Sequence, residues 1–327
     1  MFRILITAIG GLGDLIRVFP VLSSLRRFGP RARVTVLTSQ PKAREIFSLM
    51  KEELQPDEIL YWDLSRGFRE KLRILYRVRR GRFDLLLDTS RGTGWRGNYR
   101  LGRLSGARIK VGFRAKGLGA AYDVSVPFEP EVPIVEQNLS LLKACGLKTT
   151  LDFGLREDFP PPDPKGPYLV LHAASLEPGR TPSPAFWKRL VAGLLRNRPE
   201  LRLIATGTGE DRGFWQEIPG VEGRFGLSLE ALCGLIKGAQ LFLGVDSGPL
   251  HLAVALKQRT LGLFGPTSPK QVVGDFPFFE AVSARLPCAP CYRHLPGEKI
   301  RCRQAACMEG IEVEEVLNKA EFLLNPR

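Results

Sequence analysis

The sequence predicts an α/β protein with two Rossmann-like, doubly wound parallel-sheet domains facing a cleft. In the first half, short apolar segments alternate with segments whose apolar residues recur at helical spacing, which is typical of parallel strands joined by helices. Five prolines between Phe159 and Pro167 interrupt this pattern, because proline continues neither a helix nor a central strand. The alternation restarts at Tyr168. We therefore expect domains at residues 1–158 and 168–327, joined by a stiff linker at 159–167.

The elements of the first domain are expected in order along the chain. An apolar run predicts a strand at residues 3–8, a Gly-rich turn follows at 10–13, and helical spacing predicts a helix at 14–28. The β-branched segment at 33–38 predicts the second strand. Further strands are expected at 83–88 and 109–112, and further helices at 42–50, 67–80 and 135–145.

The second domain repeats the alternation. Strands are expected at 168–171, 201–206, 240–244 and 260–264, and helices at 184–196, 229–237, 249–256 and 313–324. Ser228 is a suitable N-cap for the second of these helices. The last helix is amphipathic, and its apolar face can pack back on the first domain.

The composition is that of a soluble globular protein with an excess of positive charge. Of 327 residues, 44% are hydrophobic and 25% charged, and the formal net charge is +14. No apolar run approaches the roughly 18 residues that a membrane helix needs. The apolar start resembles a signal peptide, but it ends at Gly10 and then meets Asp14 and Arg17. We therefore expect a cytoplasmic protein.

The basic residues are concentrated in two segments of the first domain. Eight Lys or Arg and one acid lie between Arg66 and Arg82, and eight more with no acid lie between Arg91 and Lys116. They form either a solvated surface or a site for an anionic partner, such as a phosphorylated glycolipid, a membrane surface or nucleic acid. Charge alone does not choose among these.

The turn after the first strand reads Gly10-Gly11-Leu12-Gly13-Asp14. It fails the dinucleotide fingerprint, because Ile16 occupies the third glycine position, and no phosphate-loop motif is present. No acid follows the second strand, which also disfavours a nicotinamide dehydrogenase. Asp14 is then either a simple helix cap or a carboxylate beside a bound molecule.

A second turn carries more chemistry. The apolar strand at 240–244 leads into Val245-Asp246-Ser247-Gly248-Pro249-Leu250-His251, so a helix begins beside an acid, a hydroxyl and a histidine. Helix N-termini present unpaired N–H groups and partial positive charge, which suits a diphosphate. The alternative is a capped helix with a structural histidine.

These turns resemble the ADP-heptose:lipopolysaccharide heptosyltransferase family, glycosyltransferase family 9. The resemblance covers nearly the whole chain and is most specific at residues 245–253 and in the turn Leu263-Phe264-Gly265-Pro266-Thr267. It implies the GT-B fold and inverting transfer without a metal ion. In agreement with this, the chain has no D-x-D pair.

The resemblance also implies roles for individual residues. Asp14 matches the general base, and Gly13, Arg91 and Arg96 lie on the acceptor side. Arg180 matches a cation that meets the diphosphate, and Glu210 an acid that binds the nucleoside. The remaining donor-binding matches are Ser175, Leu227, Asp246, Ser247, Gly248 and His251. The chain departs from the family at Ala174, which replaces a hydroxyl residue, and after Arg180, where a tryptophan is missing.

The implied function is transfer of a heptose from ADP-heptose to an anionic glycolipid, the inner core of lipopolysaccharide, with peripheral contact at the cytoplasmic face of the inner membrane. No cofactor beyond the nucleotide-sugar donor is expected. The alternatives are a related transferase with another nucleotide sugar, or a nucleic-acid-binding protein. The second is disfavoured because the chain has no recognised nucleic-acid reader motif, and no nucleic-acid partner is expected.

Six cysteines complete the inventory. Cys145 and Cys233 lie in apolar helical surroundings and are expected in the core. The other four, Cys288, Cys291, Cys302 and Cys307, cluster near the end of the chain and allow a structural zinc site, disulfides or free thiols.

Overall fold

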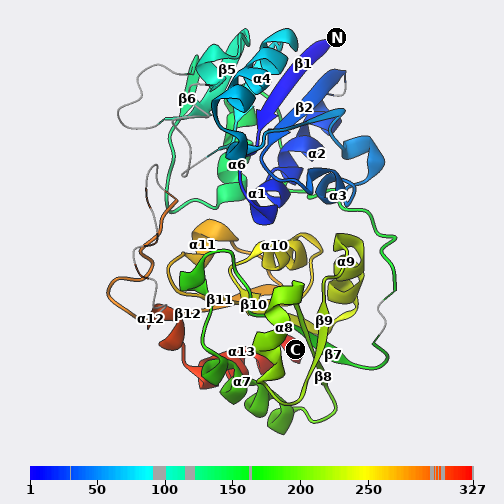
Figure 1. The fold of residues 1–327 in the computed structure, drawn as a ribbon, viewed down its shortest axis with the longest axis vertical. Helices are drawn as coiled ribbons and strands as arrows, with labels where there is room; N and C mark the ends of the chain where they lie inside the picture. The colour runs from blue at the N-terminus through cyan, green and yellow to red at the C-terminus, as the bar shows by residue number, and fades with distance from the viewer. Residues whose placement is uncertain are drawn as a thin grey trace. The chain divides into compact units, whose positions relative to one another are not determined.

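The computed structural model divides the chain into two compact units (Figure 1). They comprise Met1–Arg156 with His294–Glu298, and Glu157–Arg293 with Lys299–Arg327. The structure describes all residues except 30, 91–100, 115–121, 162–163, 295–297, 299, 301, 303–305 and 326–327. None of the helices in this described part combines the length and the apolar character that crossing a bilayer requires.

The first unit contains a six-stranded parallel sheet in the order β3-β2-β1-β4-β5-β6. Its strands are β1 (Phe2–Thr7), β2 (Ala32–Thr38), β3 (Glu58–Tyr61), β4 (Leu85–Asp88), β5 (Ile109–Phe113) and β6 (Val124–Val126). Its helices include α1 (Leu12–Ile16), α2 (Phe19–Phe28), α3 (Ala43–Phe47), α4 (Gly67–Arg80) and α6 (Ile134–Lys143). In such a doubly wound sheet, ligands bind where the strand order reverses, which is here between β1 and β4.

The expected helix at 14–28 is two helices. The first ends at Ile16, and Pro20 stands in the first turn of the second. Proline lacks the N–H that a continuous helix would need at this position, so the helix restarts there. The break leaves α1 as a short turn of helix directly after β1.

The second unit repeats the topology in the order β12-β11-β10-β7-β8-β9. Its strands are β7 (Tyr168–His172), β8 (Arg202–Gly207), β9 (Val221–Phe225), β10 (Leu241–Val245), β11 (Thr260–Phe264) and β12 (Phe279–Ser283). Its helices are α7 (Pro184–Asn197), α8 (Arg212–Gln216), α9 (Leu229–Gly238), α10 (Gly248–Ala255), α11 (Pro269–Val272), α12 (Ala306–Glu309) and α13 (Val313–Leu324). Ser228 caps α9 as expected, since its hydroxyl accepts a hydrogen bond from Ala231 N. The switch point lies between β7 and β10.

The last helix, α13, belongs to the second unit. Its Leu317 packs so closely on α7 that a Cβ on Gly193 would lie 2.6 Å from the leucine side chain. Ion pairs join Lys319 to Glu280 on β12 (2.8 Å) and Glu321 to Arg198 after α7 (2.8 Å). The apolar face of this helix fills the core of its own domain.

Candidate functional site

Asp14 lies in α1, directly after the carboxyl end of β1. Its Oδ2 accepts a hydrogen bond from the Gly11 amide (2.9 Å), and its Oδ1 lies 3.4 Å from a terminal nitrogen of Arg17. A Cβ on Gly10, whose φ is +156°, would come within 2.1 Å of the same carboxylate, so the turn requires glycine. The buried Gly13 offers its carbonyl to Arg17 Nε (3.0 Å). The Asp14 side chain remains 40% exposed, so it caps the helix and is still open to solvent.

A second carboxylate at this switch point was not expected from the sequence. Asp88 ends β4, is buried, and accepts hydrogen bonds from the hydroxyls of Thr7 on β1 and Tyr122. The Ser90 amide donates to the same carboxylate (2.9 Å). Asp88 therefore ties the ends of β1 and β4 together beside the turn that carries Asp14. The available signal was an apolar strand that ends in Asp-Thr-Ser.

Asp246 is the centre of the site in the second unit. It follows β10, is only 2% exposed, and its Oδ2 lies 3.1 Å from a terminal nitrogen of Arg180. The Thr267 hydroxyl donates to the same oxygen (2.8 Å), and His251 Nε2 lies 3.7 Å from Oδ1. Burial alone would raise the pKa of Asp246, but Arg180, His251 and Thr267 together hold it below its ordinary value. The carboxylate is therefore ionised and holds Arg180 and His251 in place.

The N-terminus of α10 lies next to this pair. Ser247 is the N-cap residue in an extended conformation, Gly248 begins the helix and Pro249 follows in the first turn. The Ser247 hydroxyl oxygen is buried and has no hydrogen-bond partner among the described residues. The Nε of Arg180 is likewise buried and unpartnered among them. Helix N–H groups, a hydroxyl donor and a guanidinium thus meet at one place, which suits an anion with several oxygens.

The adjoining loop after β7 contributes Ser175, whose hydroxyl donates to the Asp246 carbonyl (3.4 Å). The Arg180 guanidinium also lies 5.9 Å from the centre of the Tyr292 ring, within reach of a cation–π contact. His172 ends β7, and burial lowers its pKa to about 4 despite Asp211 and the Thr206 carbonyl, which favour its charged form. His172 is therefore neutral at pH 7, with Nδ1 3.1 Å from the Thr206 carbonyl oxygen.

Glu210 and Leu227, the expected nucleoside contacts, follow the adjacent strands β8 and β9. Glu210 lies in the turn Gly209–Asp211 and is exposed, and Leu227 is half-buried. Both follow the carboxyl ends of strands, the same end of the sheet from which Asp246 and Ser247 extend. The structure therefore brings Arg180, Ser175, Asp246, Ser247, Gly248 and His251 together, and places Glu210 and Leu227 along the same sheet edge.

The four clustered cysteines line one small cavity. Gly179 and Pro266 line it too, so the cavity adjoins the loop that carries Arg180. Burial raises the pKa of Cys307, and Cys291 and Cys302 act in the same direction. No disulfide joins these four cysteines, and among the described residues no group of three or more His, Cys, Asp or Glu is arranged to hold a metal ion.

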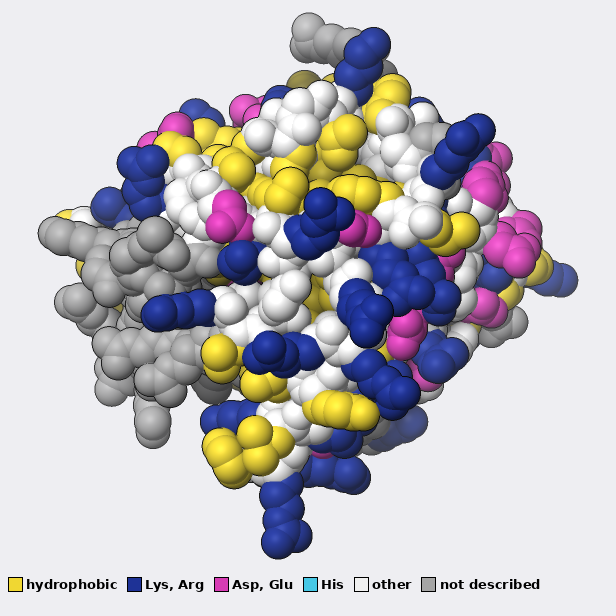
Figure 2. Space-filling view, turned by 90° about the horizontal axis from the view of Figure 1, so that it is seen from above, with side chains coloured by type: hydrophobic (Ala, Val, Ile, Leu, Met, Phe, Trp, Pro, Cys, Tyr) yellow, Lys and Arg dark blue, Asp and Glu magenta, His cyan; other side chains and the backbone are white. Residues whose placement is uncertain are grey.

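Of the basic residues expected on the acceptor side, Arg91 and Arg96 lie outside the described part of the chain. The first basic segment forms the turn Leu64–Arg66 and α4. Figure 2 views the molecule from the end at which α4 lies in Figure 1, and shows Lys and Arg side chains spread over it with hydrophobic side chains between them.

Comparison with known proteins gives related sequences. A model for "Glycosyltransferase family 9 (heptosyltransferase)" matches residues 221–299. Lipopolysaccharide heptosyltransferase 1 of Pseudomonas aeruginosa is 30% identical over 189 residues, 53% of each chain, so this match spans about half of that protein. Lipopolysaccharide heptosyltransferase 3 of Escherichia coli is 24% identical over 95% of this chain and 96% of its own length.

Solved structures share the fold at low identity. A glycosyltransferase family 9 protein of Veillonella parvula aligns with a TM-score of 0.73 at 17% identity, over 99% of this chain and 97% of the other. E. coli heptosyltransferase WaaC with ADP aligns with a TM-score of 0.70 at 17% identity, over 98% of this chain and 97% of the other. The iron-containing dodecameric glycosyltransferase TibC of enterotoxigenic E. coli aligns with a TM-score of 0.60 at 18% identity, over 99% of this chain and 77% of the other. The two-domain fold is thus GT-B, and the part of the chain that the glycosyltransferase family 9 model matches includes β10, the N-terminus of α10 and β11.

Proposed function

We propose that this protein transfers a heptose from ADP-heptose to the inner core of lipopolysaccharide, with inversion at the anomeric carbon. The names of the two relatives support heptosyl transfer to lipopolysaccharide, and the ADP in a structure of the same fold supports the nucleotide. Within this chain, the observation that supports the proposal most directly is the buried Asp246–Arg180 pair beside the N-terminus of α10.

The donor diphosphate would bind at that N-terminus. When the bond to the sugar breaks, negative charge develops on the departing diphosphate, and groups already aimed at it lower the barrier. The Gly248 end of α10, the Ser247 hydroxyl and Arg180 supply such groups. Asp246 is 2% exposed, and its carboxylate pairs with Arg180 and accepts a hydrogen bond from Thr267. It would therefore orient these groups rather than contact the diphosphate itself. We assign it a positioning role, together with His251.

The nucleoside would lie further along the same sheet edge. Glu210 is exposed at the end of β8, where its carboxylate can accept hydrogen bonds from ribose hydroxyls. Leu227 is half-buried after β9 and can contact the face of a base. Ser175 would contact the donor from the loop after β7, where its hydroxyl lies 3.4 Å from the Asp246 carbonyl oxygen.

Asp14 would be the general base. A sugar hydroxyl is a weak nucleophile near neutral pH, and a carboxylate that accepts its proton during attack contributes about 10²–10⁴-fold. The Asp14 carboxylate is 40% exposed although it caps α1, so an acceptor hydroxyl can reach it from solvent. Its contacts with the Gly11 amide and Arg17 hold the carboxylate in a fixed orientation at the start of α1.

We further propose that transfer needs no metal ion, because the helix N-terminus and Arg180 supply positive charge and the chain has no D-x-D pair. One structural relative contains iron, so the metal requirement of this protein has to be tested directly. Turnover should be unchanged in EDTA. Activity that is lost in EDTA and restored by magnesium would refute the proposal, whereas slow loss with release of zinc would assign a structural metal to the cysteine cluster.

The acceptor would be an anionic glycolipid reached by peripheral contact at the cytoplasmic face of the inner membrane. Gly13, Arg91 and Arg96 are the acceptor-side residues of this proposal. Replacing both arginines by Gln should raise the acceptor KM and reduce its dependence on salt, because screening weakens exposed charge pairs. Equal acceptor constants in the variant and the wild type would remove these arginines from the site.

Calorimetric titration with ADP-, UDP- and GDP-sugars tests the donor. We expect ADP-heptose to bind most tightly, and a preference for another nucleotide sugar would indicate a related transferase. Ser247→Ala should weaken ADP binding about tenfold, the value of a hydrogen bond to a charged group. The matched control is Thr260→Val, which removes a buried hydroxyl of the same unit at the amino end of β11, the opposite end of the sheet from the site. Equal ADP affinity in both variants would exclude Ser247 from the diphosphate site.

A further inference from the structure

Helix α4 carries an apolar stripe on its solvent side. Phe68, Leu72 and Tyr76 follow one another at intervals of four residues and are 72%, 50% and 62% exposed. Leu64, in the turn before the helix, continues the series and is 54% exposed. Residues spaced by four lie on one face of a helix, so Phe68, Leu72 and Tyr76 form a continuous strip rather than scattered exposed groups, and Leu64 precedes it in the chain.

The stripe is not the face that packs on the domain. Ile74 and Val78 are fully buried in the core of the first unit. At about 100° per residue, their direction lies roughly 140° away from the centre of the stripe. Helix α4 is thus apolar on two sides, and the core accounts for only one of them.

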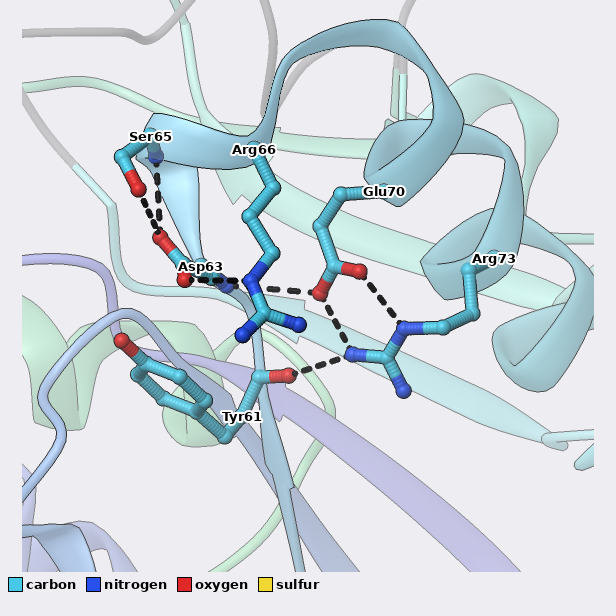
Figure 3. Close-up of polar contacts among 6 residues, drawn as sticks. All are labelled: Tyr61, Asp63, Ser65, Arg66, Glu70 and Arg73. Carbon is cyan, nitrogen blue, oxygen red and sulfur yellow. Dashed lines mark hydrogen bonds and ion pairs between the residues drawn. The ribbon is translucent and has the colours of Figure 1, made fainter.

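Polar contacts hold the helix firmly in this orientation (Figure 3). The buried Glu70 accepts a hydrogen bond from Arg73 Nε (2.6 Å), and Arg73 also donates to the Tyr61 carbonyl of β3 (3.2 Å). The Arg73 side chain holds the pKa of Glu70 below its ordinary value, so this link persists at neutral pH. Asp63 accepts from Ser65 and pairs with Arg66 at the start of the helix. The exposed stripe is therefore fixed in place.

Basic side chains flank the stripe. The exposed positions of the turn and helix include seven Lys or Arg, namely Arg66, Arg69, Lys71, Arg73, Arg77, Arg79 and Arg80, whereas the acid Glu70 is buried. Arg80 donates to the Tyr76 hydroxyl (3.2 Å) and lies 5.9 Å from its ring centre. An apolar strip with an aromatic ring, bordered by long cationic side chains, is the pattern of helices that lie in the plane of a membrane surface.

We propose that α4 docks on an anionic lipid surface, with Leu64, Phe68, Leu72 and Tyr76 inserted at the level of the headgroups and the flanking cations against lipid phosphates. Charge complementarity selects this occupant: the strip alone would suit any apolar partner, but its basic border favours a negatively charged one. Nucleic acid would use the cations and leave the apolar strip in water, so it explains only half of the surface.

This inference deepens the proposed peripheral contact with a membrane. It does not depend on sugar transfer, because vesicle binding uses neither donor nor acceptor. Heptosyl transfer can therefore fail while docking holds, and docking can fail while transfer holds.

Vesicle flotation with the full chain tests the proposal. The protein should bind vesicles of phosphatidylcholine mixed with phosphatidylglycerol, and bind phosphatidylcholine alone at least about tenfold more weakly. The triple variant Phe68→Ser, Leu72→Ser, Tyr76→Ser should lose at least about tenfold in affinity for the mixed vesicles. Phe322→Ser on α13 is the matched control, because Phe322 is 65% exposed in the second unit. This control should bind as the wild type does.

The three substitutions lie on exposed positions, so the melting temperature should not fall. If the triple variant fails to fold, Phe68→Ser alone is the second variant, with a smaller loss in the same direction. Mixed-vesicle binding that is unchanged in the folded variants would overturn the proposal. Equal binding to neutral vesicles would refute the electrostatic part, and release of the protein from vesicles by duplex DNA would identify nucleic acid as the partner instead.

Discussion

Replacing Asp246 by Asn should destabilise the protein strongly, because it removes the charge that compensates Arg180 inside the second unit. Coulomb's law gives roughly 5 kcal/mol for unit charges 3.1 Å apart at an effective dielectric constant of about 20. The Arg180 side chain is 14% exposed and can recruit water in the variant, which lowers the expected loss of unfolding free energy to about 3 kcal/mol. Asn keeps the size of the side chain and an oxygen for Thr267, so charge is the main change.

A double-mutant cycle separates this pair from its surroundings. Asp246→Asn, Arg180→Met and the double variant are compared with the wild type by urea unfolding. The double variant should be about 2–3 kcal/mol more stable than the sum of the single losses predicts, because each single change leaves a buried charge without its partner. The control pair is Arg202–Glu222, which is just as close (2.6 Å) but 36% and 43% exposed. Its coupling should be under about 1 kcal/mol.

Two results would refute this reasoning. If Asp246→Asn unfolds at the wild-type urea concentration, the carboxylate does not compensate a buried charge. If the two pairs show equal coupling, burial is not what makes the Asp246–Arg180 pair strong. Calorimetry with ADP on the same variants tests the positioning role, because a misplaced Arg180 should weaken ADP binding about tenfold or more.

Three further outcomes are expected. Asp14→Asn should fold and bind ADP normally but lose about 10²-fold or more in kcat, and near-normal turnover would leave only the helix cap. His251→Ala should weaken ADP binding without changing the acceptor KM, and unchanged ADP affinity in titration would remove it from the donor site. Burial lowers the pKa of His172 to about 4, so between pH 6.5 and 4 the unfolded chain binds the extra proton. Stability should therefore be constant above pH 6.5 and fall by about 3 kcal/mol towards pH 4, and urea unfolding of His172→Gln should lack this part of the decline.

The fold class predicted from the sequence is confirmed, and the missed strands have a common cause. The strands β3, β6, β9 and β12 were not expected, and all four are sheet edges. Central strands such as β4 are buried on both faces and read as unbroken apolar runs, Leu85-Leu86-Leu87 in this case. Edge strands face solvent and carry polar residues, as Glu222 and Arg224 do in β9, so their pattern cannot be told from that of a loop.

The residues of the second-unit site were predictable because most of them are contiguous in sequence. A strand end and a helix start bring Asp246, Ser247 and His251 together by local geometry alone. Which groups each would contact was not predictable. The pairing of Asp246 with Arg180 joins residues 66 positions apart, and it buries the carboxylate that the sequence placed among the donor-binding residues. Asp88 was missed for the same reason, since the hydroxyls that it accepts from, on Thr7 and Tyr122, lie 81 and 34 positions away in the sequence.

The exposed apolar strip of α4 could not be predicted from the sequence, for a different reason. Periodicity assigns five apolar residues to one helix, but it does not predict which of them are buried in the core. These residues are Phe68, Leu72, Ile74, Tyr76 and Val78. A single amphipathic helix and a helix with two apolar faces give similar patterns until the neighbouring sheet is placed. The structure decides the matter by burying two of these side chains and leaving three exposed among arginines. The composition did not show what the basic residues of this segment bind. In the structure they border an exposed apolar strip, and the combination of charge and apolar surface favours a lipid surface, which charge alone does not.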